Sequence, residues 1–201
     1  MFLVFEGIDG SGKSSQLRRL AGRIEALGRT VCRLVEPTDG PHGAEIRRRA
    51  AGEGAPMSAR EELDLFVADR RENVAGNIQP ALARGEVVLQ DRYFYSTAAY
   101  QAALPELGLT SGDVIAMHEG WAARPDRVLL LDLAVDVGLA RVQRRGARDA
   151  FENVERQEHV RSSFLALAAA DERFTVVDAS QDPDAVADAV WAAVGPLLEA
   201  A

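Results

Sequence analysis

The stretch FEGIDGSGKSSQ, from Phe5 to Gln16, decides the fold and follows an apolar run at the start of the chain. Within it, GIDGSGKS fits the pattern G-x4-G-K-[S/T], with an apolar strand pattern before it and a helical pattern after it. Glycines let successive backbone N–H groups turn inward, and a helix N-terminus adds partial positive charge. The stretch therefore predicts a nucleoside triphosphate site rather than a glycine-rich turn without a ligand.

We expect this loop to bind ATP through one contiguous set of residues: Gly7, Ile8, Asp9, Gly10, Ser11, Gly12, Lys13, Ser14 and Ser15. Lys13 is expected to reach the β and γ phosphates and to act in catalysis, and Ser14 to ligate Mg²⁺. A GTPase would carry an N-K-x-D motif, and no asparagine in this chain precedes a lysine. A small phosphotransferase therefore remains as the favoured class.

Length and composition exclude several other classes. The chain has 201 residues, of which 47% are apolar and 27% charged, and its formal net charge is −8. This length suits one domain, and no apolar run approaches the ~20 residues of a membrane span. The acidic balance argues against nucleic acid as a partner, because duplex binding needs clustered cations. Since the first residues lack a basic leader, we expect a cytoplasmic protein without membrane contact.

Five short apolar segments predict strands, and they cover residues 2–6, 30–36, 86–91, 126–132 and 174–178. Their Val and Leu content predicts burial on both faces, and helical patterns between them predict βαβ crossovers. The expected helices cover residues 13–27, 58–84, 93–103, 110–122, 135–145, 152–171 and 184–199. The predicted fold class is α/β, a P-loop NTPase fold with a five-stranded parallel sheet wrapped by helices on both faces.

Helical spacing within residues 62–74 places an aromatic ring and a guanidinium one turn apart, at Phe66 and Arg70. Such a pair offers a flat stacking surface and a forked donor for a base carbonyl. The spacing alone leaves open a second interpretation, in which the ring is core and the guanidinium reaches solvent.

The stretch QDRYFYSTAAYQ follows the third apolar segment, at the sheet edge where ligands of parallel sheets collect. Asp91 could organise Mg²⁺ through water or instead cap the next helix, and Arg92 could clamp an acceptor phosphate during catalysis. Three further side chains could face the same pocket, although the tyrosine could equally be core: Thr97, Tyr100 and Gln101.

Charged and imidazole side chains elsewhere give weaker signals. Glu36 closes the second apolar segment, and Arg47 lies on a short helical pattern within residues 43–49. Either of them could be a solvated surface charge. The three histidines, His42, His118 and His159, form no ligand spacing, and we expect no chemistry from them.

Arginines gather again between two later helical patterns, in the segment ARVQRRGARDAFE. A hinged arginine loop is the usual form of a lid, so we expect a lid over approximately residues 141–152. It would exclude water and neutralise charge on the transferred phosphoryl group through Arg144, Arg145 and Arg148. A solvated basic face is the alternative.

Taken together, FEGIDGSGKSSQ, EP, GAEIR, LFVADR, DRYFYSTAAYQ, PDRVLLLD and RRGARDAFE resemble thymidylate kinase in order and spacing over nearly the whole chain. The resemblance implies a homodimer that transfers the γ-phosphoryl group of Mg·ATP to dTMP. It implies that Phe66 stacks on thymine and that Arg70 reads its carbonyl. The other implied substrate contacts are Thr97 and Gln101 near the base, Arg47, Arg92 and Glu36 in the substrate site, and Asp9 and Tyr100 near the deoxyribose.

One position departs from the family pattern. The family has T-R-E-P-G-G-T after the second strand, whereas this chain has LVEPTDG, so that Val35 replaces the arginine. The loss of that charge leaves another deoxynucleoside monophosphate open as the acceptor. A deoxynucleoside kinase with Glu36 as its base is the nearest rival, although the tryptophan that follows Glu-Pro in those enzymes is missing. A catalytically silent nucleotide-binding regulator is the alternative from a different class.

Overall fold

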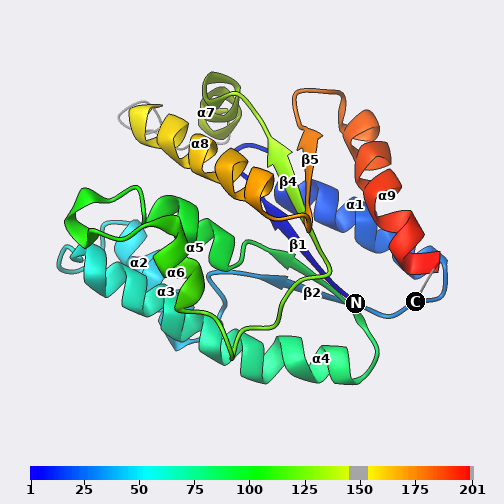
Figure 1. Ribbon diagram of the computed structural model, residues 1–201, viewed down its shortest axis with the longest axis horizontal. Helices are drawn as coiled ribbons and strands as arrows, with labels where there is room; N and C mark the ends of the chain where they lie inside the picture. The colour runs from blue at the N-terminus through cyan, green and yellow to red at the C-terminus, as the bar shows by residue number, and fades with distance from the viewer. Residues whose placement is uncertain (145–153, 200–201) are drawn as a thin grey trace.

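The computed structural model describes residues 1–144 and 154–199, and it contains one five-stranded sheet between two groups of helices (Figure 1). All strand pairs are parallel, and the strand order is β2-β3-β1-β4-β5. The strands are β1 (Phe2–Glu6), β2 (Val31–Val35), β3 (Val87–Asp91), β4 (Arg127–Asp132) and β5 (Phe174–Asp178). The predicted α/β class and parallel sheet are therefore confirmed.

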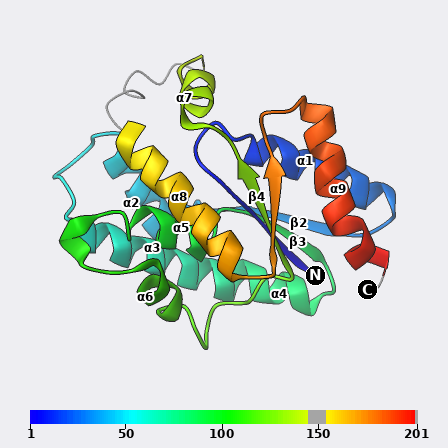
Figure 2. The same ribbon diagram turned by 45° about the horizontal axis from the view of Figure 1, so that its top comes forward.

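Helices cover both faces of this sheet (Figure 2). The α-helices are α1 (Lys13–Ala26), α2 (Pro41–Ala50), α3 (Ala59–Asn73), α4 (Gln79–Ala83), α5 (Phe94–Tyr100), α6 (Ser111–Ala116), α7 (Val135–Gln143), α8 (Val154–Ala170) and α9 (Pro183–Glu199). A π-helical turn, η1 (Val74–Ile78), joins α3 to α4, and a 3₁₀ turn, η2 (Pro105–Leu107), precedes α6. None of the helices within the described ranges is long and apolar enough to cross a bilayer.

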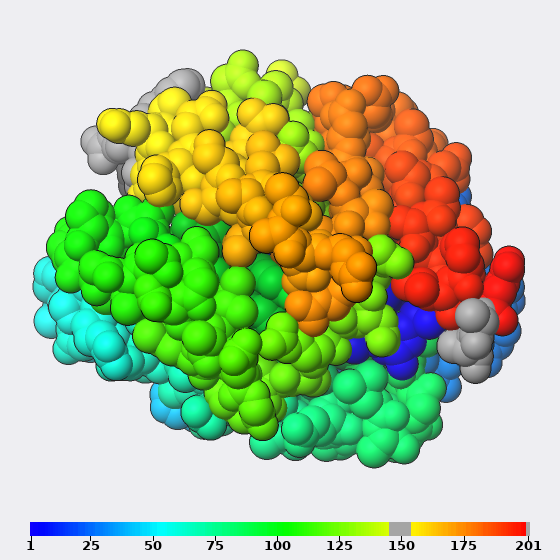
Figure 3. All heavy atoms as spheres, viewed as in Figure 1, coloured from blue at the N-terminus to red at the C-terminus, as the bar shows by residue number. Residues whose placement is uncertain are grey.

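The core forms because side chains of a strand alternate between the two faces of the sheet. On β1, Leu3 and Phe5 pack with α1 and α9, whereas Phe2 and Val4 pack with η1, α5 and α8. All five residues of β1 are buried, as expected for a central strand of a parallel sheet. Figure 3 shows α8 and the region around α5 and α6 closing over one face, so that little of the sheet is visible there.

The edge strands differ from the expectation of burial on both faces. Val35 in β2 and Val176 in β5 each keep 50% of their surface exposed. These two strands lie at the ends of the sheet, where helices cover them less completely than the three central strands. Continuous apolar sequence therefore did not distinguish the central strands from the edge strands.

Three helices also differ from their predicted form: one contains a π-helical turn, and two end earlier than predicted. The expected helix 58–84 contains the π-helical turn, and the expected helix 93–103 ends at Tyr100, shortly before Pro105. The expected helix 110–122 ends at Ala116, and Gly120 beyond it has a φ of 79°, which a continued helix cannot adopt.

Candidate active site

The loop between β1 and α1 owes its shape to three glycines with positive φ: Gly7 at 139°, Gly10 at 81° and Gly12 at 97°. Only glycine adopts such backbone angles without strain. Gly10 is also sterically confined, since a Cβ there would lie 2.3 Å from the carbonyl oxygen of Gly138. The loop therefore depends on backbone conformation, and its helix α1 begins directly at Lys13.

Lys13 is the only lysine of the chain, and its side chain is buried within this loop. Its Nζ donates to the carbonyl oxygens of Gly7 and Ile8, both at 2.9 Å. Burial, together with the nearby charge of Arg92, lowers the pKa of Lys13 to about 8. The backbone thus fixes one ammonium group beside the helix N-terminus, where an anionic ligand is favoured.

Two side-chain oxygens that could bind a metal ion, from Ser14 and Asp91, lie together beside this ammonium group. Ser14 Oγ donates to Asp91 Oδ2 over 2.5 Å, which joins the start of α1 to the carboxyl end of β3. Asp91 does not cap α5, because that helix has no side-chain cap at its N-cap residue, Tyr93. Hydroxyl and carboxylate oxygens suit Mg²⁺, which usually keeps water and substrate phosphates as its remaining ligands. No cluster of three metal-binding side chains occurs in the described ranges.

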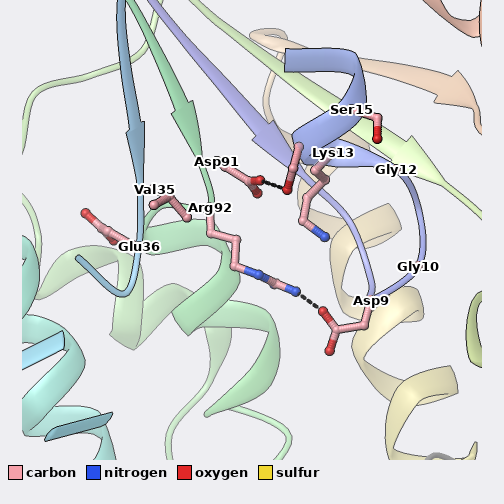
Figure 4. A pocket seen from close by; sticks show the side chains of 10 residues that line it. Asp9, Gly10, Gly12, Lys13, Ser15, Val35, Glu36, Asp91 and Arg92 are labelled. Carbon is pink, nitrogen blue, oxygen red and sulfur yellow. Dashed lines mark hydrogen bonds and ion pairs between the residues drawn. The ribbon is translucent and has the colours of Figure 1, made fainter. Parts of the chain in front are cut away.

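The side chain of Arg92 extends from the end of β3 toward Asp9 in the phosphate-binding loop (Figure 4). Its backbone φ is 66°, a left-handed value that is uncommon outside glycine and costly for a large residue. One guanidinium nitrogen pairs with Asp9 Oδ1, and the other donates to Ser96 Oγ at 3.1 Å. Burial alone would raise the pKa of Asp9, but the charges of Arg92 and Lys13 outweigh it and hold that pKa below its ordinary value.

Glu6 is a buried carboxylate that the sequence interpretation missed. Its Oε1 accepts from the backbone N–H groups of Tyr93 and Ser96 at 2.8 and 3.1 Å, and its Oε2 accepts from Ser96 Oγ at 2.5 Å. Burial raises the pKa of Glu6 to about 7. The carboxylate holds the first turn of α5, which follows Arg92. The available signal was an acid at the end of a fully buried strand.

Two neighbouring cavities divide the site. The first, of about 220 Å³, is lined by Asp9, Gly10, Gly12, Lys13, Ser14, Ser15, Val35, Glu36, Asp91 and Arg92. Three residues predicted for ATP, Gly7, Ile8 and Ser11, lie in the same loop but do not line this cavity. Val35 lies at its rim and is half exposed, at the position where the family pattern has arginine.

The second cavity, of about 270 Å³, is lined by every residue that the sequence predicted for the acceptor: Asp9, Glu36, Arg47, Phe66, Arg70, Arg92, Thr97, Tyr100 and Gln101. Residues not predicted complete the lining: Pro37, Ile46, Ala50, Glu62 and Ser96. Asp9, Glu36 and Arg92 line both cavities, so these three residues form a wall that the two cavities share.

Arg70 does not reach solvent, which excludes the interpretation in which its guanidinium is solvated. Its guanidinium is 1% exposed, and its Nε donates to Glu36 Oε2 at 2.8 Å. Its Nη2 donates to Thr97 Oγ1 at 3.1 Å, and Glu36 Oε1 accepts from Asn73 at 3.0 Å. Phe66 is half-buried on the cavity wall one turn away. Both residues therefore face the second cavity, and Glu36 is held on both of its oxygens.

His118, Asn73 and Gln90 also belong to this buried polar network, although sequence reasoning gave none of them a role. The Nε2 of His118 lies 2.9 Å from Arg70 Nη1. Asn73 donates to Gln90 Oε1 at 3.1 Å, and Gln90 Nε2 donates to the carbonyl oxygen of Arg92 at 2.8 Å. The sequence predicted no chemistry for His118, and the structure places it in this buried network as a neighbour of Arg70.

The remaining predicted arginines occupy the edges of the site. Arg47 on α2 donates to the carbonyl oxygen of Pro37 at 2.8 Å and pairs with Asp39 at 3.0 Å. Arg144 is exposed directly after α7, whereas Arg145 and Arg148 lie outside the described residues.

Arg141, the first residue of the predicted lid, lies within α7. It donates to the carbonyl oxygens of Gly10 at 3.3 Å and Ala179 at 3.2 Å. The start of the predicted lid segment is therefore tied directly to the phosphate-binding loop.

Comparison with known proteins agrees with this geometry. The sequence model of the family described as Thymidylate kinase matches residues 5–190. A thymidylate kinase of Solidesulfovibrio magneticus is 43% identical over 209 aligned residues, which cover 98% of this chain and 100% of that protein. A thymidylate kinase of Xanthomonas campestris pv. campestris is 44% identical over 187 residues, which cover 92% of this chain and 79% of that protein.

Proposed function

The chain belongs to the thymidylate kinase family, and we propose that it transfers the γ-phosphoryl group of ATP to dTMP, giving dTDP and ADP. One observation carries the proposal. The phosphate-binding loop and a cavity with a half-buried aromatic ring and a buried guanidinium share a wall of Asp9, Glu36 and Arg92. A donor phosphate and an acceptor monophosphate bound on the two sides of this wall would meet at Arg92.

The transfer needs no protein base. A phosphate monoester has a second pKa of about 6, so its oxygen is largely deprotonated at neutral pH. That oxygen attacks the γ-phosphorus of ATP, the bond from this phosphorus to the β,γ-bridging oxygen breaks, and ADP leaves. Glu36 is poorly suited to act as a base, because Arg70 and Asn73 occupy both of its oxygens. This pairing argues against the deoxynucleoside kinase alternative.

Charge stabilisation is the main task of the side chains at this wall. Lys13 and Arg92 would face the negative charge that spreads over the transferred group. Asp9 would hold the guanidinium of Arg92 in place through their ion pair. The left-handed backbone of Arg92 supports such a role, because strained residues cluster at functional sites.

We further propose Mg²⁺ as the cofactor, held by Ser14 directly and by Asp91 through water. The 2.5 Å contact between their oxygens supports this assignment, since both are hard donors already gathered at one point. Held by these two residues, Mg²⁺ would supply positive charge that offsets part of the negative charge of the ATP phosphates. Arg144, Arg145 and Arg148 are proposed to act from a lid over approximately residues 141–152, as the arginine pattern of the sequence suggests.

The acceptor, the assembly and the location carry separate proposals. Val35 lies next to Glu36, a residue of the wall that both cavities share, and stands where the family pattern has arginine, which leaves another deoxynucleoside monophosphate as the second candidate acceptor. A homodimer rests on the family resemblance, and sedimentation velocity would test it. A cytoplasmic location without nucleic-acid or membrane partners rests on the acidic composition and on ATP as donor, and cell fractionation would test it.

Product analysis tests the proposed function. Purified protein is incubated with dTMP, with Mg·ATP, and with both, and the nucleotides are separated by ion-exchange chromatography. We expect equal amounts of dTDP and ADP only when both substrates are present, and no product from Lys13→Ala. The appearance of ADP without dTDP, or the absence of any product from the wild-type protein, would contradict the proposal.

A further inference from the structure

A buried histidine contacts the acceptor-site arginine from the side opposite Glu36. His118 follows α6, is 2% exposed and does not line the acceptor cavity. Its Nε2 lies 2.9 Å from Arg70 Nη1, at a separation of 48 residues along the chain. Its ring is stacked 5.4 Å from Phe94 and lies 5.2 Å from Trp121, so aromatic neighbours on two sides hold the imidazole plane.

The partners of the two ring nitrogens define the tautomer. Nδ1 lies 2.7 Å from the carbonyl oxygen of Val114, which can only accept a hydrogen bond. Nδ1 therefore carries the proton, and in the neutral ring Nε2 must be an acceptor. The guanidinium of Arg70 can only donate, so the two groups are complementary. Burial and the charges of Arg70 and Arg71 lower the pKa of His118 to about 4, which keeps the ring neutral near pH 7.

The donors of Arg70 can be followed one by one. A guanidinium has five N–H groups in a fixed plane. Nε donates to Glu36, and Nη2 lies 2.6 Å from the same carboxylate and donates to Thr97. Nη1 donates one of its two hydrogens to His118. Among the described residues, one N–H of Nη1 is left without an acceptor, and Arg70 lines the acceptor cavity.

We infer that His118 is a positioning residue for recognition of the acceptor base. By accepting one N–H of Arg70 Nη1, it fixes the guanidinium so that the remaining N–H meets a carbonyl oxygen of the base. Recognition then uses one oriented hydrogen bond, because Glu36 and Thr97 occupy the other side of the fork. This inference rests on the proposed function and assigns a role to a residue that does not itself touch substrate.

Two amide substitutions of His118 separate the hydrogen-bond acceptor at Nε2 from the rest of the imidazole ring. His118→Gln can place its carbonyl oxygen near the position of Nε2 and accept from Arg70. His118→Asn is one methylene shorter, so it can serve Val114 but not Arg70. His118→Leu, of similar volume and without polar atoms, is a second variant that lacks the acceptor. Ser111→Ala is the matched control, because it removes a hydrogen bond from α6 to the Ala98 carbonyl and involves neither Arg70 nor His118.

Steady-state kinetics with dTMP and dCMP supply the readout. For the Asn and Leu variants we expect the dTMP KM to rise about tenfold, the effect of losing one well-made buried hydrogen bond. The ATP KM and kcat should stay within about twofold, because only acceptor binding is affected. The preference for dTMP over dCMP should fall, since cytosine offers an amino group where thymine offers a carbonyl. The Gln variant and Ser111→Ala should resemble the wild type.

The outcomes separate this inference from the proposed function. Absence of dTMP turnover by the wild-type protein would contradict the proposed function. Wild-type turnover, with an unchanged dTMP KM in whichever of the Asn and Leu variants folds by circular dichroism, would overturn only the role of His118. An equal rise in Ser111→Ala would also overturn it, because that result would show a general packing effect.

Discussion

The two sides of the active site are built in different ways. The donor side is one contiguous loop in which backbone groups and glycine conformations do most of the work, with one lysine and one serine hydroxyl added. The acceptor side is assembled from side chains of the segment after β2 and of α2, α3 and α5, joined by buried ion pairs and hydrogen bonds. A backbone-built site is sensitive to any Cβ, whereas a site built from side chains is sensitive to the loss of one partner.

The largest expected effect is on the donor side, at Lys13. Lys13→Ala should lower kcat by about a thousandfold or more, because the charge facing the transferred group is lost. The acceptor side should be left intact, so dTMP should still bind with an affinity close to that of the wild type. Initial rates of ADP release and calorimetric titration with dTMP check the two parts. A variant that lost dTMP binding as well would show that the two sides are not separable.

The matching change on the acceptor side is Arg70→Ala. It should mainly raise the dTMP KM, because the base loses its donor while the phosphates stay aligned. It should also lower the free energy of unfolding by about 3–5 kcal/mol, since Glu36 is left as a buried charge without its partner. Kinetics at saturating ATP and urea unfolding measure both effects. Unchanged kinetics with every acceptor would show that Arg70 does not read the base.

The next expected effect is on the free energy of unfolding, which should depend on pH because of Glu6. Its pKa is raised from 4.5 to about 7 in the folded protein, so the folded state binds more protons than the unfolded state between these values. Its contribution to stability is therefore full below about pH 4.5 and is lost as the pH rises through 7. The difference in unfolding free energy between wild type and Glu6→Gln should fall by an amount on the order of 3 kcal/mol across this window.

Urea unfolding at pH 5, 6, 7 and 8 measures this difference. His118 changes stability in the opposite direction, because its lowered pKa makes stability rise as the pH increases from about 4 toward 6.5. Taking the difference between variant and wild type cancels the His118 contribution. A difference that did not change with pH would show that Glu6 is ionised throughout.

A smaller effect is expected at the backbone of the donor loop. Gly10→Ala should destabilise the protein by about 1–3 kcal/mol and weaken ATP binding, because φ is 81° and the new Cβ would meet the Gly138 carbonyl. Gly22→Ala is the matched control on α1, where no atom lies within 4 Å of the new Cβ. It should stabilise the protein by about 0.5–1 kcal/mol. Thermal unfolding of both variants, with and without ATP, measures the change in stability and the loss of ATP binding.

The smallest expected effect is at Val35. Restoring the family arginine with Val35→Arg adds a cation at the rim of the first cavity, where the side chain is half exposed. An exposed pairing of this kind contributes up to about 1 kcal/mol, so the dTMP KM should fall by roughly two- to fivefold. The same assay at 0.5 M salt should remove most of the gain. No change at low salt would show that this position does not face the acceptor phosphate.

The same contrast explains which parts of the site could be predicted from sequence. The donor loop is local, so eight consecutive residues predicted it, and the strand ends predicted where Asp91 and Arg92 would lie. Glu6 and His118 could not be assigned, because their roles depend on contacts with Ser96 and Arg70 at separations of 90 and 48 residues. Helical spacing placed Arg70 beside Phe66 but could not show that Glu36 buries its charge.

The most direct test of the whole interpretation is a comparison of acceptors. ADP release from Mg·ATP is measured with dTMP, dUMP, dCMP, dGMP, dAMP and thymidine in separate reactions of the wild-type protein. We predict the highest kcat/KM for dTMP and no turnover of thymidine, which lacks the attacking phosphate. Turnover of thymidine alone, or the absence of acceptor-dependent ADP release, would contradict a monophosphate kinase with a base-reading acceptor site.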